Sequence, residues 1–200
     1  MKIKSFFFIA FSVLISFNSL AQIKERKFKI HTLAFYNLEN LFDTINDVNK
    51  NDEASPIMEI KFNRGKIYKQ KISNMARVIS EIGNDVTNRP PTIIGICEVE
   101  NRNVVEDLIA NEKLSKYNYG IVHYDSPDRR GIDVGLLYNK DIFKVTNSNS
   151  HVLYINYNNT SNRSYTRDQL VVSGKLDGEL IHLIVNHWPS RGANETKRIA

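Results

Sequence analysis

Residues 92–101 read Thr-Ile-Ile-Gly-Ile-Cys-Glu-Val-Glu-Asn, an apolar run rich in β-branched side chains that ends on carboxylates. Short runs of this kind, bounded by turn-forming residues, are typical of buried strands. Residues 31–40 and 181–191 have the same design, and their apolar runs stop at Asn37 and His187. Because ligands of α/β proteins usually bind at the ends of strands, we expect the three polar endings to share one site.

The rest of the pattern predicts a mixed α/β chain. Apolar residues recur at helical spacing over residues 68–82, and a shorter helix is predicted over 104–109. The polar residues 43–63 between the first strand and the longer helix predict a surface loop. Further strands are predicted at residues 117–124, 132–138, 142–146, 151–157, 169–176 and 179–185. Asp177-Gly178, between the last two, is a strong hairpin signal, and the order of elements favours α/β layers.

The beginning of the chain has the pattern of an export signal. Residues 1–4 are basic, residues 6–17 are apolar, and Ser19-Leu-Ala21 offers the small residues of a cleavage site. We therefore expect residues 1–21 to be a signal peptide and the mature protein to be periplasmic or secreted, beginning at Gln22. The apolar stretch is too short for a comfortable membrane span, so no stable membrane association is expected.

Composition sets further bounds. Two hundred residues, 42% of them apolar, are enough for one domain or most of one. The formal net charge of +5 falls to +3 when Lys2 and Lys4 leave with the signal peptide. This mild excess is compatible with a polyanionic substrate without requiring one. The single cysteine, Cys97, cannot form an internal disulfide and is expected to be a small buried hydrophobe.

Each polar residue has a structural explanation beside a catalytic one. Glu98 is suited either to an ion pair with a nearby arginine or to Mg²⁺, which takes oxygen ligands. Asn37 suits a turn cap or an amide ligand of the same ion, and His187 suits backbone hydrogen bonding or proton transfer. The planar fork of Arg167 suits a phosphate, although isolated surface arginines are common. Taken singly, these residues favour the structural explanations.

Taken together, they resemble the endonuclease/exonuclease/phosphatase superfamily, which includes pancreatic-type deoxyribonuclease, abasic-site endonucleases, neutral sphingomyelinases and inositol polyphosphate phosphatases. In sequence, the first and last of the matching segments are similar to the secreted bacterial branch often labelled endonuclease. Five segments in the family's order carry the resemblance: Phe35-Tyr-Asn-Leu-Glu-Asn-Leu-Phe42, Ile96-Cys-Glu-Val-Glu-Asn101, Arg130-Gly-Ile-Asp-Val-Gly-Leu-Leu-Tyr138, Thr166-Arg-Asp168 and Val185-Asn-His-Trp-Pro-Ser-Arg191.

This resemblance implies a fold and a set of site residues. The fold is a four-layer α/β sandwich of two mixed sheets with outer helices, in a domain that begins at residue 22. The implied roles are Glu98 and Asn37 for Mg²⁺ or Mn²⁺, Arg167 and His187 for the phosphate, Asp133 for orienting the ring of His187, and Tyr124 and Arg130 for the substrate backbone.

The family also uses an Asp-x-Asn motif after the histidine strand and an Asp-His pair near its C-terminus. The chain stops at Ala200 before either motif, and residues 194–200 predict the start of a helix. We therefore expect the C-terminal part of the domain to be missing, with about half to two-thirds of the sandwich present. By itself the 200-residue chain is expected to be inactive.

The function implied by the resemblance is metal-dependent phosphodiester hydrolysis by an exported nuclease acting on DNA or RNA. A phosphatase or lipid phosphodiesterase of the same family would use the same core residues, because fold does not choose among substrates. A non-catalytic, secreted polyanion-binding protein is an alternative of another class. The sequence has no obvious membrane-inserting segment, which favours a nucleic acid.

Overall fold

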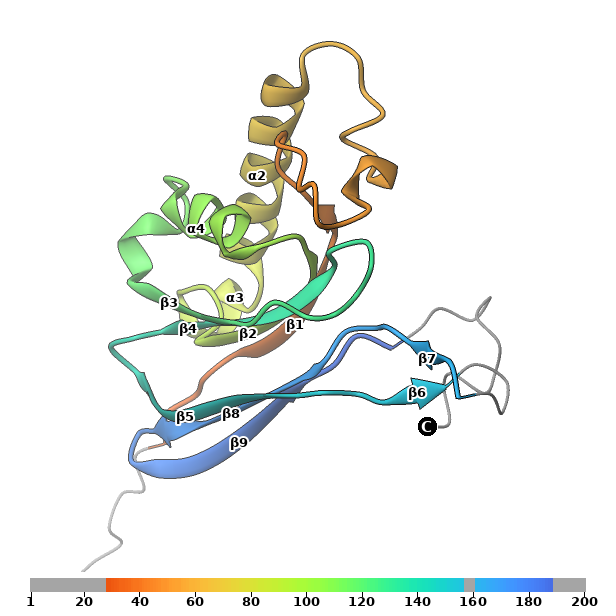
Figure 1. Cartoon of the computed structure of the whole chain (residues 1–200). Helices are drawn as coiled ribbons and strands as arrows, with labels where there is room; N and C mark the ends of the chain where they lie inside the picture. The colour runs from red at the N-terminus through yellow and green to blue at the C-terminus, as the bar shows by residue number, and fades with distance from the viewer. Residues whose placement is uncertain (1–27, 157–160, 189–200) are drawn as a thin grey trace, which may run out of the picture. The chain divides into compact units, whose positions relative to one another are not determined.

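The computed structural model describes residues 28–156 and 161–188 (Figure 1). The predicted signal peptide and the helix start predicted at residues 194–200 lie outside the described residues. The chain divides into two units, Met1–Ile30 and His31–Ala200. Of the first unit only residues 28–30 are described, and their side chains are exposed. The second unit contains all the helices and strands of the described residues.

A four-stranded mixed sheet is the centre of this unit. Its first two strands run parallel, and its other neighbouring pairs run antiparallel. In register, Val99 lies beside both Leu41 and Asp133, so the ends of two strands and the beginning of a third form one rim. The strand order is β1 (Leu33–Leu41), β2 (Ile93–Val99), β4 (Asp133–Asn139) and β3 (Tyr119–His123).

Helices cover one face of this sheet (Figure 1). They are α2 (Arg64–Glu81), α3 (Asn84–Thr87) and α4 (Arg102–Ala110). The apolar stripes of α2 and α4 pack with Ile94 and Ile96 of β2 in one core cluster. Asn101 begins α4 as a cap, because its Oδ1 accepts a hydrogen bond from the Val104 amide at 3.1 Å. Short 3-10 turns occupy Asp52–Ala54 and Ser115–Tyr117.

A second sheet packs on the other face. It consists of β5 (Phe143–His151), β8 (Gln169–Leu176) and β9 (Glu179–Val185), and a second core cluster joins its inner side chains to those of β2 and β4. β2 is buried along almost its whole length because both faces of its sheet are covered. A small ribbon of β6 (Ile155–Asn156) and β7 (Arg163–Ser164) lies between β5 and β8 in the sequence.

The predicted α/β class and layering are confirmed. Two details differ. The second sheet was expected to be mixed, but its described strands pair only antiparallel, as the tight turn at Asp177-Gly178 requires of β8 and β9. The two strands predicted at 142–146 and 151–157 are replaced by the single strand β5 and by β6. Residues 147–150, which separate the two predicted strands, continue β5, and Asn147 and Asn149 are exposed on this strand at the edge of the described sheet. In the part of the chain that the structure describes, no helix has the length and apolar character needed to cross a bilayer.

Candidate active site at the sheet rim

Glu98 stands outside the regular ladder of its own sheet. Cys97 pairs with Val134 and Val99 pairs with Asp133, so Glu98 is an extra residue between two consecutive rungs. Its backbone φ is +59°, a left-handed conformation that costs a residue other than glycine about 1–2 kcal/mol. Bulges of this kind turn a side chain in a new direction and are frequent beside active sites. The bulge therefore brings the carboxylate to the rim.

Three of the predicted residues meet at this carboxylate. Asn37 Nδ2 donates a hydrogen bond to Glu98 Oε1 at 2.9 Å, and the backbone N–H of Asn40 donates to Oε2 at 3.0 Å. His187 Nε2 lies 3.3 Å from the same Oε1. Asn37 lies within β1, at the point where its regular pairing with β2 is interrupted, Glu98 is in the bulge of β2, and His187 follows the end of β9. Their convergence at one rim is the geometry that the strand endings predict.

The amide of Asn37 is turned so that it supports Glu98. Its Oδ1 accepts a hydrogen bond from the Glu39 N–H at 2.7 Å, and this leaves Nδ2 to face the carboxylate. In this orientation Asn37 positions Glu98, whereas the resemblance implied a second oxygen ligand. A single carboxylate still fits Mg²⁺, because this ion usually keeps several waters and takes one or two protein carboxylates.

Arg167 is buried and holds the backbone of His187. Its Nη1 donates to Asp128 Oδ2 at 3.0 Å and its Nη2 donates to the His187 carbonyl at 2.9 Å. Only 8% of its surface is exposed. The resemblance implied a phosphate contact; here Nη1 and Nη2 are engaged within the protein, and Nε is buried without a hydrogen-bond partner among the described residues. The arrangement makes Arg167 a positioning residue.

Asp128 is a site residue that the sequence analysis missed. Besides Arg167, it accepts a hydrogen bond from the Arg130 N–H through Oδ1 at 2.9 Å, and it lies 3.6 Å from the Arg130 side chain. An aspartate just after a proline and just before two arginines is a turn-forming position. That local pattern was the available signal, but sequence gives no sign that the carboxylate is buried.

The surroundings of His187 favour its neutral form, because its pKa is lowered. Burial lowers the pKa of its ring, the positive charges of Arg167 and Arg130 lower it further, and the Glu98 carboxylate opposes them. Its Nδ1 is buried and has no hydrogen-bond partner among the described residues. A neutral imidazole carries one donor and one acceptor, so this ring can donate to or accept from a substrate oxygen.

Asp133 pairs with a different histidine from the one expected. Its Oδ2 lies 3.1 Å from His123 Nε2, and its Oδ1 accepts a hydrogen bond from the Ser126 N–H at 2.9 Å. His123 is paired in register with Gly135, two residues from Asp133, so the two side chains are diagonal neighbours on one face of the sheet. The register of β3 and β4 thus provides His123 as the partner, and the implied role of orienting His187 is not the one Asp133 has in this structure.

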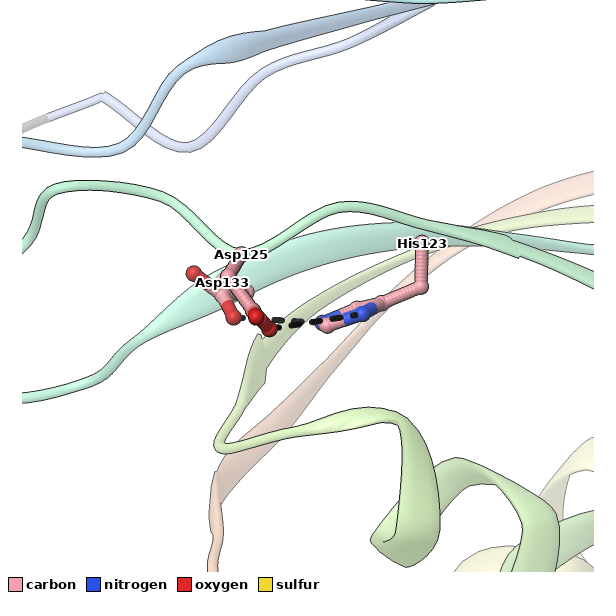
Figure 2. A group of neighbouring side chains, drawn as sticks. All are labelled: His123, Asp125 and Asp133. Carbon is pink, nitrogen blue, oxygen red and sulfur yellow. Dashed lines mark ion pairs between the residues drawn. The ribbon is translucent and has the colours of Figure 1, made fainter. Parts of the chain in front are cut away.

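Asp125 joins this pair to form a group with the composition of a metal site (Figure 2). One ligand atom each from His123, Asp125 and Asp133 lie within 4.8 Å of one another. Imidazole and carboxylate ligands suit zinc and other transition metals. His123 and Asp125 were not among the site residues predicted from the sequence, although their His-x-Asp spacing on one strand end was visible.

The two predicted substrate-binding residues differ in their surroundings. The Arg130 side chain is half exposed and lines a cavity of about 190 Å³ together with Asn40 and Phe42. Tyr124 instead joins the two sheets, because its hydroxyl donates to the Ser148 carbonyl at 3.1 Å and lies 2.7 Å from Ser148 Oγ. Arg130 is therefore half exposed at the rim and paired with Asp128, and the Tyr124 hydroxyl is hydrogen-bonded to Ser148.

Glu100 is a carboxyl group that titrates near neutrality. Burial raises its pKa to about 7, and the charges of Asp43, Asp52 and Asp47 act in the same direction. The Asp43 N–H donates to Glu100 Oε2 at 2.7 Å and partly offsets the rise. Glu100 thus fastens the polar loop after β1 to the end of β2, two residues from Glu98.

Comparison with known proteins assigns the chain to a family. Residues 32–199 match the profile of the Endonuclease/Exonuclease/phosphatase family. The chain belongs to this family. A comparison with curated proteins gave no match.

Several solved structures are similar to the chain. Zebrafish (D. rerio) TDP2 humanized by 14 mutations is 15% identical, with 82% of this chain and 49% of that one covered and a TM-score of 0.45. An endonuclease/exonuclease/phosphatase from Bacteroides vulgatus is 18% identical, with 78% and 51% covered and a TM-score of 0.44. ANGEL2, described as a 2',3'-cyclic phosphatase, is 12% identical, with 80% and 41% covered and a TM-score of 0.48. The chain spans about half the length of these structures.

Proposed function

We propose that the protein is a metal-dependent phosphodiesterase, and more specifically an exported nuclease that acts on DNA or RNA. The observation that carries this proposal is the contact of Glu98 with both Asn37 and His187 at the rim. A carboxylate, a neutral imidazole and a nearby guanidinium suit a phosphodiester, and membership of the family supports this chemistry.

The residues of the rim have different roles in this proposal. Glu98, oriented by Asn37 and the Asn40 N–H, would hold Mg²⁺ or Mn²⁺, which polarises a phosphate and stabilises negative charge in the transition state. His187 offers a ring nitrogen to a phosphate oxygen or to the leaving oxygen. Arg130 supplies positive charge beside it. Arg167 and Asp128 fix the backbone that carries His187.

This activity is proposed for the whole protein, because the chain spans about half the length of the structures to which it is similar. Export is part of the same proposal, based on the signal pattern of residues 1–21. N-terminal sequencing of the native protein is expected to begin at Gln22. A retained Met1 in cytoplasmic protein would contradict export without affecting the proposed chemistry.

The decisive variant is Glu98→Gln, which keeps the shape of the side chain and removes its charge. Hydrolysis of bis(p-nitrophenyl) phosphate and of plasmid DNA in Mg²⁺ is expected to fall well beyond tenfold, a loss greater than about 1.4 kcal/mol in the barrier. Glu81→Gln, on the exposed side of α2, is the matched control and is expected to retain wild-type activity. Near-wild-type activity of Glu98→Gln in saturating Mg²⁺ would refute the proposal. Salt-sensitive DNA binding without turnover in the wild type would favour the non-catalytic alternative.

A further inference from the structure

Four side chains beside the rim form a continuous stack of alternating rings and cations. The guanidinium carbon of Arg163 lies 4.4 Å from the ring centre of Tyr154 and 4.8 Å from that of Tyr165. The guanidinium of Arg129 lies 5.5 Å from the ring centre of Tyr165. Contacts of this length between a cation and an aromatic face are attractive. We refer to Tyr154, Arg163, Tyr165 and Arg129 as the Tyr–Arg ladder.

The ladder contains hydrogen-bond donors that nothing in the described structure satisfies. Nε and Nη2 of Arg163 are buried, and neither has a hydrogen-bond partner within residues 28–156 and 161–188. Buried polar groups in native proteins nearly always have a partner, so each exception requires an explanation. A guanidinium presents its donors in a planar fork that matches the oxygens of a phosphate. The unsatisfied edge of Arg163 therefore points to an anionic ligand.

The inner end of the ladder borders an open cavity. Tyr165 and Arg129 line a space of about 470 Å³ together with Lys50 and Asn49. Asp128 also lines it, but its carboxylate is already engaged by Arg167 and Arg130. The cations that line the cavity thus outnumber its one carboxylate, which favours a polyanion.

The ladder is continuous with the candidate active site. Tyr165 lies two residues before Arg167, which holds His187, and Arg129 lies between Asp128 and Arg130. Arg163 is on β7, and β6 and β7 extend beyond the rim end of the second sheet (Figure 1). At the outer end Tyr154 is 72% exposed. The stack thus begins at the rim and leads away from it.

We propose that the Tyr–Arg ladder binds a single-stranded nucleic acid next to the phosphodiester that is cleaved. Arg163 and Arg129 hold backbone phosphates, and the exposed ring of Tyr154 stacks on a base. A single strand fits because its bases are free to stack on aromatic side chains, whereas those of a duplex already stack on one another. This inference rests on the proposed function, since it names the substrate class of the same site.

Oligonucleotide affinity and its salt dependence test the stacking role of Tyr154 and the phosphate-binding role of Arg163 separately. The probe is a fluorescein-labelled oligothymidylate of about twelve nucleotides, within the usual range of single-strand sites, with EDTA present to prevent cleavage. Tyr154→Leu is expected to weaken binding roughly tenfold and to leave the salt slope unchanged, because stacking carries no charge. Arg163→Met is expected to weaken binding and to reduce the slope of log Kobs against log salt by about 0.7, the share of one phosphate contact.

Arg77→Met on α2, which removes an exposed arginine paired with Glu81, is the matched control for charge. Arg163→Lys keeps the charge but loses the planar fork, and it is expected to restore the salt slope with only part of the affinity. Thermal melting of each variant shows whether it is folded. If Arg163→Met unfolds, Arg163→Lys and Tyr154→Leu still decide the outcome.

The inference about the Tyr–Arg ladder can be contradicted while the proposed function still holds. Hydrolysis of bis(p-nitrophenyl) phosphate, which is too small to reach the ladder, is expected to be unchanged in Tyr154→Leu and Arg163→Lys. The inference would be overturned if these folded variants bound the oligonucleotide with wild-type affinity. It would also be overturned if they lost as much affinity for a duplex of the same length as for the single strand. Either result leaves the phosphodiesterase proposal standing. Loss of the small-substrate activity in Glu98→Gln alone tests that proposal.

Discussion

The guanidinium of Arg167 fixes the backbone of His187, with Nη2 donating to the His187 carbonyl at 2.9 Å and Nη1 bound to Asp128 at 3.0 Å. The place of the imidazole is thus determined by a buried ion pair that does not touch the ring. Asp128 belongs to the loop before β4 and His187 follows β9, so this pair also ties the two sheets together at the rim.

Asp128→Asn is expected to destabilise the protein. The substitution leaves the charge of Arg167 buried without a counter-charge, and breaking a buried pair from one side typically costs about 3–5 kcal/mol. Urea unfolding measures the loss. Asp85→Asn, at an exposed position of α3, is the control and is expected to change stability by less than about 0.5 kcal/mol. Equal stability of the two variants would show that the pair does not hold the rim.

Glu98→Gly is expected to be more stable than Glu98→Ala. Both variants lose the carboxylate and its hydrogen bonds, so they differ only in the backbone cost at φ +59°. Glycine adopts this conformation freely, whereas alanine pays about 1 kcal/mol or more. Urea midpoints of the two proteins give the comparison. At a regular strand position the order would be reversed, and a reversed order would contradict the bulge.

Glu100→Gln is expected to change how stability depends on pH. The folded-state pKa of Glu100 is raised from 4.5 to about 7, so the folded state favours the protonated form. Stability from this group is present in full below about pH 4.5 and is lost as pH rises through about 7. The wild type therefore loses stability between about pH 5 and 8 that the glutamine variant keeps. Glu106→Gln, on the exposed side of α4, should follow the wild type.

Cys97 is expected to resist alkylation in the native protein. It is 1% exposed, and burial together with the nearby Glu98 carboxylate raises its pKa to about 12. Thiolate is the reactive form, so almost none is present at neutral pH. Iodoacetamide labelling followed by intact mass should give no adduct until urea unfolds the protein. Rapid labelling under native conditions would show that the β2 strand opens easily.

The strand endings predicted much of the rim because they depend on short-range pattern. The apolar runs before Asn37, Glu98 and His187 are local features, and β-strands that end on polar residues meet wherever their sheets share an edge. The pairing of Asp133 with His123 was beyond reach, because it depends on the register between β3 and β4. Asp128 was missed for a similar reason, since its partner Arg167 is 39 residues away in the sequence.

The long strand β5 shows a second limit of prediction from the sequence. Residues 147–150 were not predicted to be part of a strand, because their polar pattern does not show that they pair with β8 at the edge of the described sheet. Register and edge position arise only when the whole sheet assembles, so no window of a few residues contains them.

The bulge at Glu98 separates the residues that the sheet needs for pairing from the residue that carries the carboxylate. If residue 98 were deleted, Cys97 and Val99 would become neighbours opposite Val134 and Asp133, which are themselves neighbours, and the ladder between β2 and β4 would close without a gap. The sheet would then be more regular and free of the strain at φ +59°. Pairing between β2 and β4 therefore does not require residue 98, and the strain is a local cost of placing a carboxylate at the rim. What the position gives in return is the set of contacts that Glu98 makes with Asn37, the Asn40 N–H and His187.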